Sequence, residues 1–119
     1  KLMKIEKNKG EAIVEINGKE WHFKWGINAA EIIERNIGIM SESNAAFIKM
    51  LIYAGAMNKM RANELTTDFN FEDAGELIDE LNQQDKEQLT ALALESLGFI
   101  KGLATLITSQ TDKIITPEK

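Results

Sequence analysis

The segment from residue 45 to residue 57 constrains the fold most, because it is apolar on nearly every side of a helix. Its single charged residue is Lys49. One broad face of the helical wheel holds Phe47, Ile48, Leu51, Ile52 and Gly55. A second stripe, on roughly the opposite side, holds Met50, Tyr53, Met57 and Met60. A helix that is hydrophobic all round must be buried all round. We therefore expect it at the centre of a bundle, or with one face against a partner.

The length of 119 residues predicts a single domain, residues 1–119. Within it we expect a β-hairpin at about 11–25, a helical part at about 28–108 and a frayed tail at 109–119. The absence of cysteine excludes disulfides and thiol chemistry and fits a reducing cytoplasm. The longest apolar run is about a dozen residues, short of the roughly 20 needed to span a bilayer, so no membrane association is expected.

Charge is distributed unevenly along the chain. Residues 1–25 hold six Lys and four Glu, a net charge of +2, whereas residues 62–98 hold ten acidic residues and one Lys, a net of −9. Such a segment repels phosphates, which argues against nucleic-acid binding, and attracts a basic partner. The acids also fit the solvated faces of two helices. The candidate acidic partner face comprises Glu72, Asp73, Glu76, Asp79 and Glu80.

The first quarter of the chain predicts antiparallel strands. Asn17-Gly18 suits a type I′ turn, because both central residues need positive φ. A two-residue turn there places Ile16 opposite Lys19, Val14 opposite Trp21 and Ala12 opposite Phe23, which brings the apolar residues to one face. Residues 3–6 predict a third strand, joined through Asn8-Lys9-Gly10.

Helical signals follow Gly26. Asn28 with Glu31 resembles a capping box, and this first helix is expected to end near Gly38. Ser41 or Ser43 is expected to cap the long apolar helix, which runs to about Asn63.

Two further helices are predicted. Asn70 with Asp73 starts one, while Phe69 and Phe71 anchor it as a hydrophobic staple. Residues 82–84 break the pattern, and Asp85 or Lys86 opens the last helix. Its apolar stripe comprises Leu89, Leu92, Ala93, Ile100, Leu103 and Ile107. The fold class is thus α+β: an N-terminal antiparallel β-hairpin or three-stranded meander followed by a bundle of about four helices.

Residue chemistry provides no catalytic, cofactor-binding or metal-binding set. His22 is the sole histidine, and it lies on the hairpin's outer face by strand alternation. The segment from Asp68 to Asp79 superficially matches a calcium loop, but it lacks the Gly at the sixth position and the Glu at the twelfth. Carboxylates at helical spacing lack an apolar pocket that would separate their pKa values. We therefore expect a protein that is not an enzyme and has no cofactor.

The stripe of Met50, Tyr53, Met57 and Met60 is the candidate partner or oligomer surface. Flexible methionine side chains suit surfaces that repack on a partner. The stripe also fits a plain core role, as the cover for Trp21 and Phe23 of the hairpin.

Three segments, in this order, resemble the tail assembly chaperones of long-tailed (siphovirus-type) bacteriophages. The first, residues 16–28, reads INGKEWHFKWGIN; the second, residues 51–55, reads LIYAG; the third, residues 68–74 and 77–81, reads DFNFEDA and LIDEL. Together they cover roughly residues 11–105.

The resemblance implies a non-enzymatic role in viral assembly. Members of the family are thought to bind the tape measure protein, keep its long helical chain soluble and help tail tube protein polymerise around it. The resemblance also implies the host cytoplasm as the location and absence from the mature virion, and we expect a homo-oligomer.

A second reading from another class is a small acidic regulator or adaptor that binds a basic protein surface. It predicts binding that is sensitive to salt, whereas chaperoning driven by apolar burial survives higher salt.

Overall fold

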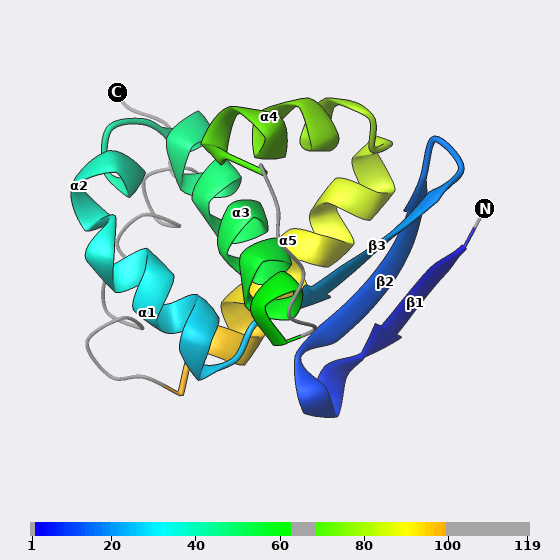
Figure 1. Ribbon diagram of the computed structural model, residues 1–119, viewed down its shortest axis with the longest axis horizontal. Helices are drawn as coiled ribbons and strands as arrows, with labels where there is room; N and C mark the ends of the chain where they lie inside the picture. Colours follow the sequence, from blue (N-terminus) through cyan, green and yellow to red (C-terminus); the bar gives the residue numbers. More distant parts are fainter. Residues whose placement is uncertain (1, 63–68, 100–119) are drawn as a thin grey trace, which may run out of the picture.

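The computed structural model describes residues 2–62 and 69–99 (Figure 1). In this part of the chain a three-stranded antiparallel meander precedes five helices, which confirms the predicted α+β class. The elements in chain order are β1 (Met3–Glu6), η1 (Lys7–Lys9), β2 (Glu11–Ile16), β3 (Lys19–Lys24), α1 (Ile27–Arg35), α2 (Ile37–Met40), α3 (Asn44–Ala62), α4 (Phe71–Asp79) and α5 (Gln83–Leu97).

The β2–β3 hairpin has the predicted register. Ile16 pairs with Lys19, Val14 with Trp21 and Ala12 with Phe23. Asn17 and Gly18 have φ values of 53° and 78°, as a type I′ turn requires. The predicted third strand is also present, since β1 pairs with β2 and reaches it through the 3-10 turn η1 and Gly10.

Helix α3 lies at the centre of the helical part, as its all-round apolar sequence predicts. It contacts β3 on one side and α1, α2, α4 and α5 on the others (Figure 1). Ser43 caps its start, since the Ser43 Oγ accepts a hydrogen bond from the Ala46 amide at 3.0 Å. The predicted helix end at Asn63 lies outside the described residues.

The sheet and α3 approach closely at Gly55. The Trp25 indole N–H donates a 2.7 Å hydrogen bond to the Leu51 carbonyl of α3, and the indole is buried. A Cβ atom at Gly55 would lie 2.5–2.7 Å from Trp25 ring atoms. Only glycine therefore allows the indole to rest against the backbone of the helix.

The predicted cap of the first helix is wrong. Helix α1 begins at Ile27 with Gly26 as its N-cap, so Asn28 lies inside the helix. The cap comes instead from α3, because the Asn58 Oδ1 accepts a 2.9 Å hydrogen bond from the Ala29 amide. Asn58 is 3% exposed, so this bond is buried and joins the two helices.

The same helix also ends earlier than predicted. Arg35 is its last residue, and Asn36 interrupts the helix while its side chain donates to the Ile32 carbonyl at 2.7 Å. A separate short helix, α2, then runs through the predicted end at Gly38.

Helix α4 begins as predicted. The Asn70 side chain accepts from the Asp73 amide at 2.9 Å, and the Asp73 carboxylate accepts from the Asn70 amide at 3.0 Å. Phe69 and Phe71 anchor this start to the hairpin and to α3 through Trp21 and Tyr53.

Helix α5 starts earlier than predicted. Asn82, interpreted from the sequence as a breaker, is its N-cap and accepts from the Asp85 amide at 2.8 Å. Leu89, Leu92 and Ala93 are buried as the stripe requires. The rest of the predicted stripe (Ile100, Leu103 and Ile107) and the predicted frayed tail lie outside the described residues.

Candidate partner-binding groove

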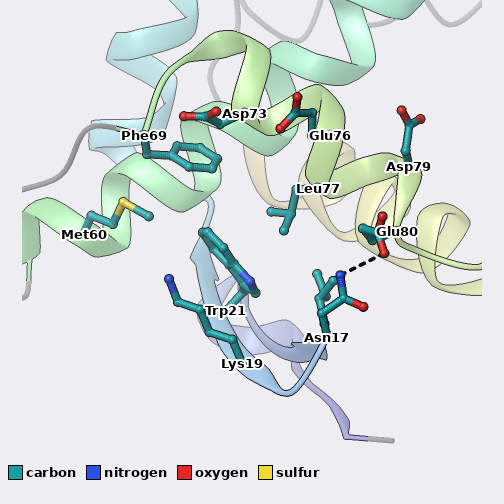
Figure 2. Close-up of a pocket in the computed structure, with 11 residues that line it drawn as sticks. Asn17, Lys19, Trp21, Met60, Phe69, Asp73, Glu76, Leu77, Asp79 and Glu80 are labelled. Carbon is teal, nitrogen blue, oxygen red and sulfur yellow. Dashed lines mark hydrogen bonds between the residues drawn. The ribbon is translucent and has the colours of Figure 1, made fainter.

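An open groove of about 740 Å³ runs between the turn end of the β2–β3 hairpin and α4 (Figure 2). The two walls come from residues far apart in sequence, and the groove exists because α4 packs against α3 while the hairpin turn extends beside it. The lining residues are Ile16, Asn17, Lys19, Trp21, Met60, Phe69, Asp73, Glu76, Leu77, Asp79 and Glu80.

The middle of the groove is apolar. The Trp21 ring lies 5.5 Å from the Phe69 ring, centroid to centroid, at an angle of 48°. Phe69 in turn stacks on Tyr53 of α3, with centroids 6.0 Å apart. Trp21 and Phe69 are half-buried, so this contact leaves part of both rings accessible to another molecule.

The wall formed by α4 is acidic. Its acidic residues are Asp73, Glu76 and Asp79 of α4 and Glu80, the C-cap residue that follows (Figure 2). Asp73 belongs to the capping box, and Glu80 accepts a 2.9 Å hydrogen bond from the Asn17 side chain across the end of the groove. Glu76 and Asp79 are exposed, and neither forms a hydrogen bond or ion pair with another described residue.

The opposite wall carries one cation. Lys19, exposed at the start of β3, places its Nζ 4.3 Å from the centroid of the Trp21 ring. It is the one Lys or Arg among the described residues that line the groove. Four acidic residues and one lysine thus line the groove, so the groove favours positive charge.

A second, smaller hollow of about 420 Å³ lies on the other side of α4, against α3. There Lys49 forms a 3.0 Å ion pair with Glu72 and lies 4.4 Å from the Phe71 ring centroid. This cation is already paired and packed, unlike the exposed Lys19.

The predicted Met/Tyr stripe is divided by the structure. Met50 is 2% exposed and belongs to the core. Tyr53, Met57 and Met60 are half-buried and pack against that core. Met60 is the member of the stripe that lines the groove. Tyr53 does not line it, but its ring stacks on Phe69, which does.

The predicted acidic face is divided as well. Asp73 and Glu80 line the groove, and Glu76 and Asp79 line both the groove and the smaller hollow. Glu72 lines only that hollow, where it pairs with Lys49 of α3. From the sequence, Asn17, Lys19, Trp21 and Phe69 were assigned to structure alone, and Leu77 was not identified as a groove residue. The sequence signal that could have indicated the groove was the presence of two aromatic clusters. One is in the hairpin and includes Trp21, and the other is at the start of α4 and includes Phe69.

His22 lies on the outer face of the sheet, where it pairs with Glu20 at 3.3 Å. Among the described residues, no group of three or more His, Cys, Asp or Glu side chains could hold a metal ion. No helix within residues 2–62 and 69–99 is both long and apolar enough to cross a membrane.

Comparison with known proteins gives no match, whether to a family model, a curated protein or a solved structure.

Proposed function

We propose that this protein is a non-enzymatic chaperone that holds a helical segment of a partner in the groove between the hairpin and α4. By its resemblance to phage tail assembly chaperones, the proposed partner is a tape measure protein, and the proposed task is to assist tail tube assembly. The proposal includes self-association, a location in the host cytoplasm and absence from the mature virion.

One observation carries the proposal: two of the three segments of the resemblance line one groove, and the other packs against Phe69 in its lining. The first segment contributes Lys19 and Trp21, and the third contributes the acidic wall. The second, residues 51–55, belongs to α3, and its Tyr53 ring stacks on Phe69 of the groove. Residues that carry the resemblance thus contribute to both walls of the groove.

The dimensions of the groove suit a short helical segment. The α4 residues that line the groove run from Asp73 to Asp79 and span about 9 Å, somewhat less than two helical turns. An amphipathic helix would place its apolar residues against Trp21, Phe69 and Met60, the helix-in-groove mode of recognition. The flexible Met60 side chain would adapt to different sequences along an extended partner.

The alternative is an acidic regulator that binds a basic protein surface. The observation that favours it is the pair of exposed carboxylates without partners among the described residues, Glu76 and Asp79. In that case the apolar part of the groove would contribute little to binding.

Co-expression with a tape-measure-like helical segment separates the two functions. We expect the full chain to bring that segment into a complex, detected by pull-down and light scattering, which persists in high salt because apolar burial drives it. Light scattering of the chain alone reports self-association. A complex that dissociates in moderate salt would favour the regulator, and the absence of any complex would contradict the chaperone.

A pair of methionine variants locates the surface. Met60→Ser should weaken the complex, because Met60 lines the groove. Met57→Ser is the matched control, since Met57 is the same residue type on the same helix, is also half-buried, and does not line the groove. Equal effects of both changes would place the binding surface elsewhere.

A further inference from the structure

We propose that the groove selects a basic amphipathic helix, and that a partner Arg or Lys binds the face of Trp21 in place of Lys19. This inference rests on the proposed helix-binding function and specifies the chemistry of the bound segment. Lys19 is then an intramolecular competitor for this cation site on Trp21.

The geometry around Trp21 is that of an occupied cation site. The Lys19 Nζ lies 4.3 Å from the ring centroid, within the range of about 6 Å for a cation–π contact. Figure 2 shows the Trp21 ring between the hairpin and the acidic wall of α4. A cation on this ring therefore lies in a groove whose other wall is negative.

The resident contact is weak enough to be displaced. Lys19 is exposed, and an exposed cation–π contact contributes less than a desolvated one. A partner helix that covers the groove would exclude water from its own cation on Trp21. Arg is favoured over Lys, because its planar guanidinium stacks on aromatic rings and is more weakly hydrated.

The unpaired charge in the groove adds to this selection. Glu76 and Asp79 lack partners among the described residues, so a basic segment gains attraction without breaking an existing ion pair there. The apolar contacts with Phe69 and Met60 would come from the same face of the bound helix. The expected motif is thus a basic residue with apolar residues three or four positions away on either side.

The test uses the full chain and two synthetic helical peptides. Both have a leucine face, and the basic residue in its middle is Arg in one peptide and the neutral isostere citrulline in the other. We expect the Arg peptide to bind more tightly to the natural chain. Lys19→Ala should tighten Arg-peptide binding by about two- to fivefold, the range expected when an exposed cation–π competitor is removed.

Two controls separate this site from general electrostatics. Lys4→Ala removes the same charge from an exposed position on β1 and should change affinity less. In a Trp21→Leu background the gain from Lys19→Ala should disappear, and Trp21→Phe provides a more conservative ring variant. Circular dichroism checks the folding of each variant.

The outcomes distinguish this inference from the function on which it rests. Equal binding of both peptides would overturn the inference alone, as would a gain from Lys19→Ala that persists without Trp21 or with citrulline. Failure of both peptides to bind would overturn the proposed function, and the inference with it. A dimer that dissociates on Trp21→Leu would assign the groove to a second copy of the chain and also overturn the inference.

Discussion

The two ends of the hairpin's inner face are covered in different ways. At one end Trp25 is 1% exposed, stacks on Phe23 and donates a hydrogen bond to the backbone of α3. At the other end Trp21 is half-buried beside an open groove and touches Lys19 and Phe69. The inner face of one hairpin thus carries a fully buried indole at one end and a half-buried indole beside the groove at the other.

The difference between the Trp25 end and the Trp21 end shows how one hairpin can be fixed in the core and still present a partly exposed aromatic ring. The Trp25 end fixes the sheet against α3 through backbone contact, which leaves little room for adjustment. At the Trp21 end the contacts go to residues that flank α4: the Trp21 ring packs on Phe69, and the Asn17 side chain donates a hydrogen bond to Glu80. We infer that the sheet and α3 form a rigid unit at the Trp25 end, and that α4 can adjust its position at the Trp21 end.

The strongest way to break this comparison is to add one methyl group at the closed end. Gly55→Ala should lower the free energy of unfolding by about 2–3 kcal/mol, because its Cβ would overlap the Trp25 ring and outweigh the helix propensity of Ala. Urea denaturation measures the change. Gly75→Ala in α4 is the matched control, since its Cβ would meet the flexible Lys49 side chain at 3.2 Å. We expect that control to be neutral or stabilised by up to about 1 kcal/mol; equal losses at both sites would refute the contrast.

The buried hydrogen bond between Asn58 and the start of α1 tests whether α1 and α3 belong to the rigid unit. Asn58→Ala should destabilise the protein by about 2 kcal/mol, because the Ala29 amide loses its acceptor away from water. Asn28→Ala, at the exposed position that the sequence predicts as the cap, should change stability by less than about 0.5 kcal/mol. Thermal unfolding of the two variants side by side tests the assignment, and a larger effect at Asn28 would reverse it.

The hairpin turn tests the open end. Gly18→Val should cost about 1 kcal/mol or slightly more, since a β-branched residue resists the φ of 78° found there. The cost is a backbone effect, because nothing lies within 4 Å of the added Cβ. Gly18→Asn should recover most of the loss, since Asn tolerates positive φ. A melting temperature that Val leaves unchanged would contradict the turn assignment.

The smallest expected effect on global stability comes from Tyr53, which supports the groove. Tyr53→Leu removes the stacked contact with Phe69 and the edge contact with Phe71. Amide hydrogen exchange should accelerate in α4 while the sheet retains its protection, because the change loosens only the wall. Tyr53→Phe preserves the ring and should leave exchange unaltered. Uniform acceleration through every element would mean that α4 belongs to the same rigid unit as the sheet.

What the sequence could predict depended on how far apart the determining residues lie. The register of the hairpin follows from Asn17 and Gly18, which occupy the turn itself. The start of α4 follows from Asn70 and Asp73, three residues apart. Local chemistry settled both, so both were predicted.

The failures that concern the groove and the cap of α1 involve contacts between distant segments. The early start of α5 is a local failure, because Asn82 caps the helix that its segment was predicted to break. The cap of α1 comes from Asn58, which lies 29 residues after the Ala29 amide that it binds. No local sequence motif predicts this contact. The groove needs the hairpin and α4 side by side, and the Asn17–Glu80 contact spans 63 residues. Met50 shares a helical stripe with Met60, yet one is core and the other lines the groove, because different neighbours cover successive turns of α3.

The contrast between the two tryptophans gives the chain a pair of built-in optical reporters. Trp25, enclosed and hydrogen-bonded to Leu51, will change its emission when the sheet separates from α3. Trp21, half-buried beneath an ammonium group, will respond when that cation leaves or another molecule covers the ring. Variants that retain one indole each would let a single fluorescence titration distinguish occupation of the groove from loss of the fold, without any attached dye.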